Sequence, residues 1–315
     1  MRFPAKAQAG VALLMAVMVV AMASTLTAGL MVTQNLSVHR AANLRSLDAA
    51  WWYLVGLEEW AGSILRRDGE DSDFDALTEV WAQRIDFLPV DEGVLAGQIT
   101  DLNGRFNLNA LGAAEPQQAL EQFQRLLAAI PELRDQPVAE LGTRIADWID
   151  ADSNPRFPGG AEDDAYLSLD PPRRAANHPL VSVSELWLIE GMTAEIYNAL
   201  VPHVAVWPWG TGGAPINVNT ATPALLQSLA EDINPGDIEA LIQIREQSPF
   251  ESIEQFNSQE VLAGRNIQAS IDVKSNLFRA EGAADIDGVR MQMVSILERG
   301  TDKRVRVLAH SLAPF

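Results

Sequence analysis

The sequence predicts an α+β protein in which a long N-terminal helix packs on an antiparallel sheet, with a large inserted all-α domain. Three observations indicate this fold class. Apolar residues dominate the N-terminal region and then recur at helical spacing to about Leu65. Period-two patterns, typical of half-buried strands, occur before about residue 110 and again after about residue 266. The patterns between these two regions are mostly helical.

The first 32 residues predict a membrane-spanning helix after a short leader. Between Lys6 and Arg40 there is no Asp, Glu, Lys or Arg. A helix needs roughly 20 mostly apolar residues to cross a bilayer, and residues 11–32 supply them. A secretory signal peptide would have a shorter apolar core of about 7–15 residues followed by a cleavage site. We therefore expect residues 1–10 to be a leader that is cut upstream of the apolar helix.

This leader resembles that of the type IV pilin-like proteins, which a prepilin peptidase cuts after a glycine. The resemblance implies processing between Gly10 and Val11 and methylation of the new N-terminus. Most pilin-like proteins carry Glu at the fifth residue after the cut, where this chain has Met15. That carboxylate is considered to meet the amino terminus of a neighbouring subunit, so its absence points to the tip of a fibre. The alternative is an uncleaved signal anchor.

Charge and composition restrict the partners. Arg2 and Lys6 precede the span, so the positive-inside tendency predicts a single-pass inner-membrane protein whose C-terminal part lies in the periplasm. The formal charge is −19, which makes nucleic-acid phosphate a poor partner. The chain contains no Cys, so disulfides and thiolate metal sites are excluded. Any metal must be held by oxygen or histidine.

The apolar helix is expected to continue beyond the membrane and to open a pilin-like α/β part over residues 33–109. Apolar side chains from Leu44 to Ile64 recur at helical spacing without an intervening Pro. A surface loop is expected at Gly69–Asp75. Alternation over residues 97–102, followed by Asn103-Gly104, predicts a strand and a hairpin turn. Strands that return to the same sheet are predicted within residues 266–315, at Ile271–Glu281, Gly288–Arg299 and Arg304–His310.

Residues 110–265 are expected to form the inserted helical domain, with two related modules. The helical patterns cover Gln117–Ile130, Val138–Ile149, Val183–Ile189, Thr193–Leu200, Pro223–Leu229, Pro235–Arg245 and Ser252–Phe256. A weak internal repeat joins the modules, because Phe106-Asn107-Leu108-Asn109-Ala110 resembles Ile216-Asn217-Val218-Asn219-Thr220-Ala221.

The second module also resembles the helix-hairpin-helix repeats of DNA-uptake receptors. Such repeats bind phosphate through backbone N–H groups and nearby Lys or Arg. Here the hairpin-like piece Asn234–Asp237 has acidic neighbours, and Arg245 is the one basic residue between Val206 and Asn257. We therefore prefer a small helical packing unit and expect no nucleic-acid binding.

An acidic segment contains the strongest candidate for a metal site. Asp150, Asp152 and Asn154 have the alternating spacing that begins an EF-hand loop. Pro155 stands in place of the turn glycine and Ala161 in place of the closing Glu, so an EF-hand is not expected. The acids at residues 162–164 can still fold back to complete an irregular calcium site. Spacing alone leaves this interpretation and a solvated acidic loop equally open.

No catalytic constellation is recognisable. The four histidines are scattered, and no zinc-peptidase, nucleophile-elbow or phosphate-loop motif is present. Asp147 and Asp150 lie three residues apart and could be paired carboxylates for hydrolysis. Metal ligation or helix capping explains them more simply, and we expect a protein that is not an enzyme.

Several of these motifs together resemble the minor pseudopilin K family of type II secretion. They are Asp147-Trp148-Ile149-Asp150-Ala151-Asp152, Gly160-Ala161-Glu162-Asp163, Tyr166, Asn177-His178-Pro179 and Ser184-Glu185-Leu186. That family also lacks the Glu after the cut and carries a large helical insertion in a pilin-like fold. It binds calcium in this region. The resemblance implies calcium ligands among Asp150, Asp152, Glu162 and Asp163, with Asn177 and Glu185 as further candidates.

The family resemblance also implies the function. We expect a minor pseudopilin that joins the I-type and J-type subunits at the tip of a periplasmic pseudopilus, caps the fibre and initiates its assembly. Such a fibre exports folded proteins across the outer membrane. The alternative is a membrane-tethered periplasmic binding or scaffold domain of the DNA-uptake type that never enters a fibre.

Overall fold

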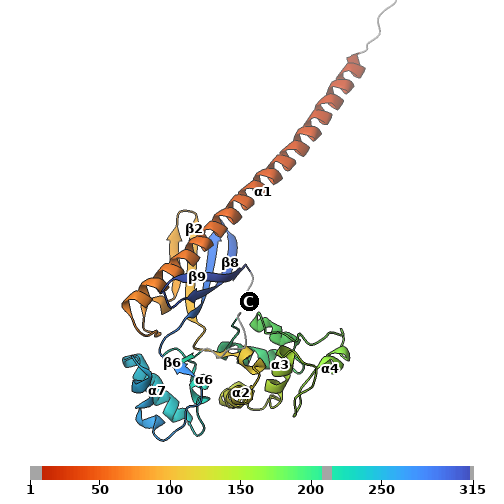
Figure 1. Cartoon of the computed structure of the whole chain (residues 1–315). Helices are drawn as coiled ribbons and strands as arrows, with labels where there is room; N and C mark the ends of the chain where they lie inside the picture. Colours follow the sequence, from red (N-terminus) through yellow and green to blue (C-terminus); the bar gives the residue numbers. More distant parts are fainter. Residues whose placement is uncertain (1–8, 208–214, 313–315) are drawn as a thin grey trace, which may run out of the picture.

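The computed structural model describes residues 9–207 and 215–312. Most of the expected leader, residues 1–8, lies outside the described residues. Helix α1 (Ala9–Asp71) is continuous from the expected processing site, through the apolar span, to the globular part. Its apolar N-terminal half is exposed from Val11 to Val32 and projects away from the rest of the chain (Figure 1).

The second half of α1 packs on a five-stranded antiparallel sheet. The strand order is β1-β2-β7-β8-β9. The strands are β1 (Ile85–Val90), β2 (Gly93–Asp101), β7 (Leu277–Ile286), β8 (Val289–Arg299) and β9 (Val305–Ser311). Ala50, Leu54, Ala61 and Leu65 are buried against the sheet, and their spacing places them on one stripe of the helix. The predicted fold class is confirmed.

Two local predictions near the start of the sheet differ from the structure. The expected hairpin turn at Asn103-Gly104 does not return the chain to the sheet, because β2 pairs with β1 before it and with β7 much later in the chain. The Asn103 side chain instead accepts hydrogen bonds from the backbone N–H groups of Asn276 (3.2 Å) and Leu277 (3.1 Å). The surface loop expected at Gly69–Asp75 is shorter than predicted, because α1 continues to Asp71 and Asp75 is buried.

The segment between β2 and β7 is mostly helical. Its α-helices are α2 (Gln117–Ala129), α3 (Leu141–Ile149), α4 (Asp163–Leu167), α5 (Ala194–Leu200), α6 (Pro223–Gln227), α7 (Pro235–Gln247) and α8 (Ile253–Asn257). The segment also contains two short pairs of parallel strands. One pair is β3 (Phe106–Asn107) with β4 (Val204–Ala205), and the other is β5 (Ile216–Asn217) with β6 (Ile271–Asp272). Short 3-10 helices cover Val80–Ala82, Leu108–Gly112, Pro131–Leu133, Val183–Leu188, Val201–His203 and Glu260–Leu262.

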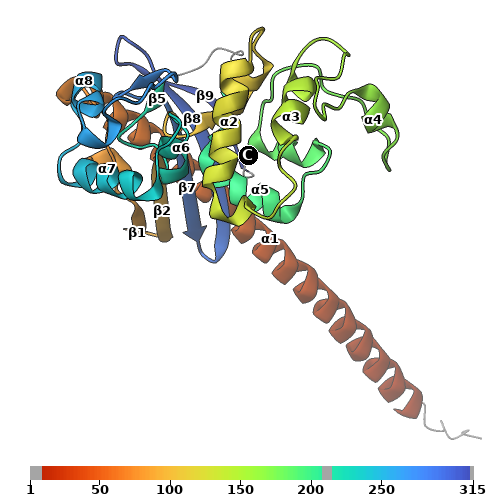
Figure 2. The same cartoon turned by 90° about the horizontal axis from the view of Figure 1, so that it is seen from below.

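The two halves of this helical segment lie side by side and share one apolar core. Figure 2 shows α2 to α5 on one side and α6 to α8 on the other. The internal repeat has the same local hydrogen bonds in both halves. Asn107 Oδ1 accepts from the Asn109 backbone N–H (3.1 Å), and Asn217 Oδ1 accepts from that of Asn219 (2.9 Å). The buried core runs without interruption through both halves.

Candidate metal centre

The acidic segment folds into a compact group of carboxylates between α3 and α4. Asp150 follows the last residue of α3, and Glu162 precedes the first residue of α4. Between them, the Asp152 carboxylate accepts a hydrogen bond from the backbone N–H of Asn154 (2.8 Å), which turns the chain back. As a result, carboxylate oxygens of Asp150, Asp152 and Glu162 lie within 4.8 Å of one another.

Glu162 is a buried member of the group whose carboxylate has no hydrogen-bond donor among the described residues. Its residue is only 5% exposed, and among the described residues neither carboxylate oxygen has a hydrogen-bond partner. Burial, together with the charges of Asp147, Asp150, Asp152 and Asp163, raises the pKa of Glu162 to about 7. A buried carboxylate without a donor is costly. A bound cation would remove that cost.

Three further buried oxygens near the end of α3 also lack hydrogen-bond partners within the described ranges, Asp147 Oδ1, Asp150 Oδ1 and Asn177 Oδ1. The Asn177 backbone N–H donates to the Trp148 carbonyl (2.9 Å), which places this residue beside the end of α3. Carboxylate and amide oxygens are the ligands that calcium prefers. The residues therefore fit a hard, oxygen-bound cation.

Not all the predicted residues come together. Asp150, Asp152 and Glu162 do, and Asn177 lies beside α3. Asp163 is close enough to affect Glu162, but its Oδ1 accepts the backbone N–H of Ala175 (3.0 Å). Glu185 has another role in this structure, because its Oε1 accepts the backbone N–H groups of Val181 and Ser182 in the capping box of the 3-10 helix Val183–Leu188.

Three residues of the centre, Asp147, Arg156 and Gly160, were not among the predicted calcium ligands. Asp147 is fully buried, and burial raises its pKa to about 6. The sequence does indicate Asp147, because this acid stands three residues before Asp150 at the end of a predicted helix. Arg156 contacts both of these acids. Gly160 approaches so closely that a Cβ built there would lie 2.1 Å from Asp147 Oδ2.

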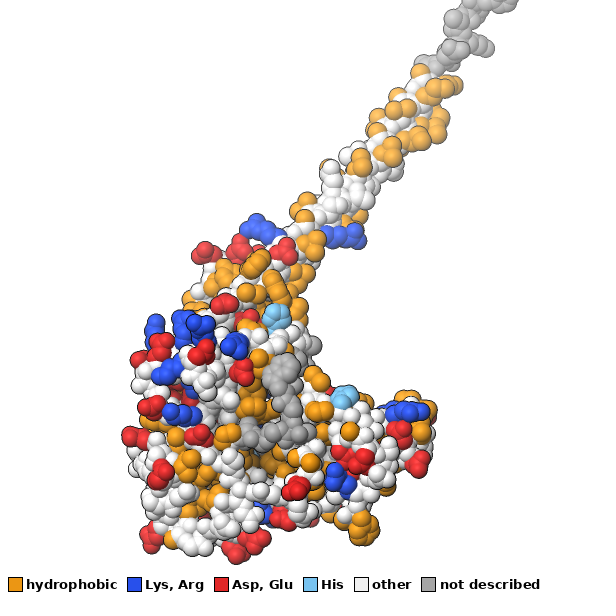
Figure 3. Space-filling model, in the orientation of Figure 1, with side chains coloured by type: hydrophobic (Ala, Val, Ile, Leu, Met, Phe, Trp, Pro, Cys, Tyr) orange, Lys and Arg blue, Asp and Glu red, His pale blue; other side chains and the backbone are white. Residues whose placement is uncertain are grey.

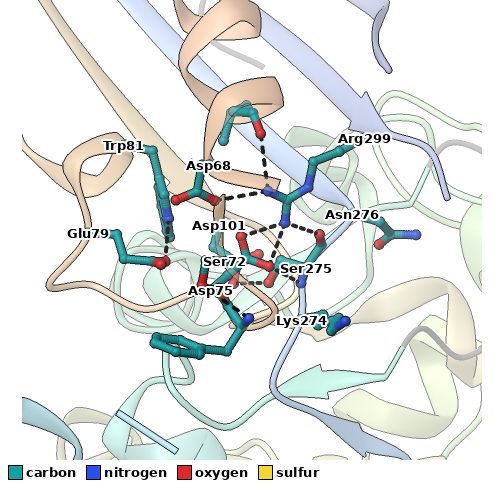
Figure 4. A network of polar contacts seen from close by, with 12 residues as sticks. Asp68, Ser72, Asp75, Glu79, Trp81, Asp101, Lys274, Ser275, Asn276 and Arg299 are labelled. Atoms are coloured by element: carbon teal, nitrogen blue, oxygen red, sulfur yellow. Dashed lines mark hydrogen bonds and ion pairs between the residues drawn. The ribbon is translucent and has the colours of Figure 1, made fainter. Parts of the chain in front are cut away.

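A second acidic group, Asp68, Asp75 and Glu79, lies at the junction between the sheet and the helical segment (Figure 4). Here the carboxylates already have donors. The Arg299 guanidinium binds Asp68 and Asp75, and Glu79 accepts the Ala76 backbone N–H and the Trp81 ring N–H. Burial, with the charges of Glu79 and Asp75, raises the pKa of Asp68 to about 7. We therefore interpret this group as a structural cluster of ion pairs and hydrogen bonds that connects the sheet to the helical segment, and we call it the joint.

Comparison with known proteins identifies the family. Two family models, both described as type II secretion system protein K, match residues 104–209 and 216–274. The type II secretion system protein K of Pseudomonas aeruginosa is 36% identical, and the alignment covers 98% of this chain and 93% of that protein. The chain belongs to the type II secretion system protein K family. The Aeromonas hydrophila member is 29% identical over 96% of each protein.

The fold agrees with a solved member of the protein K family. One chain of the crystal structure of the GspK-GspI-GspJ complex from enterotoxigenic Escherichia coli is 27% identical, with a TM-score of 0.77. The similarity covers 88% of this chain and all of that chain. Membership in the protein K family confirms the predicted identity as a minor pseudopilin of type II secretion. The DNA-uptake alternative finds no support in these comparisons.

Proposed function

We propose that this protein K caps the tip of a periplasmic pseudopilus as a non-enzymatic subunit and joins I-type and J-type minor pseudopilins there. One observation carries the proposal. The similar chain from enterotoxigenic Escherichia coli was crystallised in a complex with GspI and GspJ, and the similarity extends over 88% of the present chain. Assembly with I-type and J-type subunits is therefore the role that this similarity supports best.

The position of the helical segment supports the capping role. Figure 1 shows the helical segment at the end of the molecule opposite the projecting half of α1. In a fibre whose subunits share parallel N-terminal helices, this bulk stands where a further subunit would have to stack. The same end carries the acidic centre, far from the apolar helix.

The N-terminal helix supports a single-pass anchor in the inner membrane. From Val11 it is long and apolar enough to cross a bilayer, and hydrophobic side chains cover its projecting half (Figure 3). Charged side chains gather on the globular part in the same view. We propose that the helix is anchored after cleavage between Gly10 and Val11 by a prepilin peptidase and that the C-terminal part faces the periplasm.

We further propose that the centre between α3 and α4 holds calcium, with Asp150, Asp152 and Glu162 as ligands, joined by Asn177 through its amide oxygen. The buried and unpartnered oxygens of Glu162 support this assignment. Bound calcium would neutralise the surplus charge and fix the loop 150–162 against the end of α3. Its role is structural.

The assembly proposal is tested by co-purification of the full chain, in detergent, with I-type and J-type minor pseudopilins. A stable ternary complex is expected. A chain that binds neither subunit would favour the tethered-domain alternative. Intact mass from cells with and without prepilin peptidase tests processing, and a product starting at an N-methylated Val11 should appear only when the peptidase is present.

The calcium proposal is tested by calorimetry on the full chain in detergent. The parent should bind calcium, and the double variant Asp150→Ala plus Asp152→Ala should not. Asp164→Ala is the matched control, because Asp164 is an exposed acid of the same segment outside the carboxylate group. Absence of binding in the parent would overturn the proposal.

A further inference from the structure

Arg156 contacts both acids at the end of α3. Its backbone N–H donates to Asp147 Oδ2 (3.0 Å). Its guanidinium donates to Asp150 Oδ2 through Nη2 (2.7 Å) and Nε (3.1 Å). Nε also lies 3.3 Å from Asp147 Oδ1 as an ion pair. One residue thus contacts the carboxylates of Asp147, within α3, and of Asp150, which follows the helix as its C-cap.

These contacts are unequal between the two oxygens of Asp150. Oδ2 takes both guanidinium hydrogen bonds, whereas Oδ1 is buried and has no hydrogen-bond partner among the described residues. The side chain is 10% exposed, so water cannot readily replace a partner for Oδ1. A carboxylate held at one oxygen by a rigid fork cannot rotate freely. Its second oxygen is therefore kept in a single direction.

The guanidinium lies beside the carboxylate group and does not take the place of a cation within it. Both oxygens of Glu162 and Oδ1 of Asp150 remain without hydrogen-bond donors although Arg156 is present. If Arg156 replaced the ion, its five N–H groups would be expected to bind these oxygens. The geometry therefore separates the oxygens held by Arg156 from the oxygens left for a ligand.

We propose that Arg156 is a positioning residue of the calcium centre, which holds Asp150 and Asp147 so that Asp150 Oδ1 is directed at the ion. This inference rests on the proposed calcium function. Outer-shell groups that orient metal ligands typically contribute about 10- to 100-fold in metal affinity. The positive charge of Arg156 acts in the opposite direction, because it repels a nearby cation. The sign of the effect therefore distinguishes orientation from simple charge compensation.

The test measures calcium affinity by calorimetry on the full chain in detergent, for the parent, Arg156→Gln and Arg156→Lys. Orientation predicts that Arg156→Gln binds calcium about 10- to 100-fold more weakly. Arg156→Lys should fall between the two, because a single ammonium keeps the charge but not the fork. Arg174→Gln is the control. Its guanidinium is 3.5 Å from Asp163 and its side chain is 77% exposed, so calcium affinity should not change.

A second measurement separates orientation from a purely structural role. Terbium substitutes for calcium, and its luminescence lifetimes in H₂O and D₂O report how many waters occupy its inner shell. Arg156→Gln should add water at the bound ion because Asp150 no longer keeps its oxygen in place. Arg156→Lys, which retains the charge and is the milder variant, should show the same trend if Arg156→Gln does not fold.

Two results would overturn the inference about Arg156. One is calcium affinity in Arg156→Gln or Arg156→Lys that equals or exceeds that of the parent. The other is an unchanged number of bound waters. If the parent binds no calcium, the metal centre itself is wrong, and that outcome is recognised in the first titration before any variant is compared.

Discussion

Replacing Glu162 by Gln should have opposite effects on stability with and without calcium. In the calcium-free chain, burial and neighbouring acids raise the pKa of this carboxyl from 4.5 to about 7. The folded state therefore binds the proton more tightly than the unfolded state, so this group stabilises the fold below about pH 4.5 and that contribution is lost as pH rises toward 7. One pKa unit corresponds to about 1.4 kcal/mol, so the cost at pH 8 is about 3 kcal/mol.

Glu162→Gln removes this charge while keeping the shape of the side chain. In EDTA at pH 8, we expect the variant to be more stable than the parent, by at most about 3 kcal/mol because the amide also needs partners. In saturating calcium the parent gains binding free energy that the variant has largely lost. The order of stability should therefore reverse between the two conditions.

The assay is denaturant unfolding of the detergent-solubilised chain, followed by tryptophan fluorescence, at pH 5 and pH 8 with EDTA or calcium. The stabilising effect in EDTA should shrink at pH 5, where Glu162 is already mostly protonated in the folded parent. Asp164→Asn is the control, and its effect on the free energy of unfolding should be the same in all four conditions. An equal loss of stability in EDTA and in calcium would refute the reasoning, because it would make Glu162 an ordinary packing residue.

Three other substitutions test separate parts of the structure. Gly160→Ala should weaken calcium binding at least 10-fold and cost about 1–3 kcal/mol of stability, because its Cβ would overlap a carboxylate at 2.1 Å. Gly56→Ala, with open space around the added carbon, is the control for both measurements. Arg299→Gln should lower the free energy of unfolding by about 3–5 kcal/mol, because it leaves the buried Asp75 carboxylate unpaired. Glu185→Ala should cost about 1 kcal/mol through loss of its capping box and leave calcium affinity unchanged.

Each of these three predictions has its own contradicting result. Retained calcium affinity in Gly160→Ala would mean that the loop can move away from α3. Unfolding curves of Arg299→Gln that coincide with those of the parent would show that the joint is not needed for stability. Weakened calcium binding in Glu185→Ala would restore that residue as a ligand.

Much of the fold follows from local patterns. The 3.6-residue period and the absence of Pro predict α1 as one element, and the period-two patterns predict β8 and β9 closely. The strand predicted at Ile271–Glu281 is misplaced, because β7 covers Leu277–Ile286 and Ile271–Asp272 form the separate strand β6. The hairpin at Asn103-Gly104 was wrong for a non-local reason. β2 pairs with β7, and Asp101 lies opposite Phe278, a partner that arrives only after the whole helical segment. Turn chemistry at one dipeptide does not contain that information.

The candidate metal centre was predictable only in part. The spacing of Asp150 and Asp152 indicated a turn with oxygen ligands, and the return of the chain brings Glu162 to them. Glu185 belongs to the same set of motifs but caps a 3-10 helix, since proximity in a motif does not establish proximity in space. Arg156 had no recognisable signal. Its contribution depends on a loop that folds back over the end of α3, and no spacing rule describes that return.

The point at which the helical segment leaves the sheet has a consequence for how such a subunit could be built. β2 and β7 are neighbours, and the last residue of β2 lies opposite Phe278 near the start of β7. The two ends of residues 102–276 therefore meet at the same end of two neighbouring interior strands. A short turn joining them would leave β1, β2, β7, β8 and β9 in the same order. The head of the molecule is thus an insertion whose chain leaves and re-enters a small helix-and-sheet subunit at adjacent strands, and a change in its length need not alter the strand order.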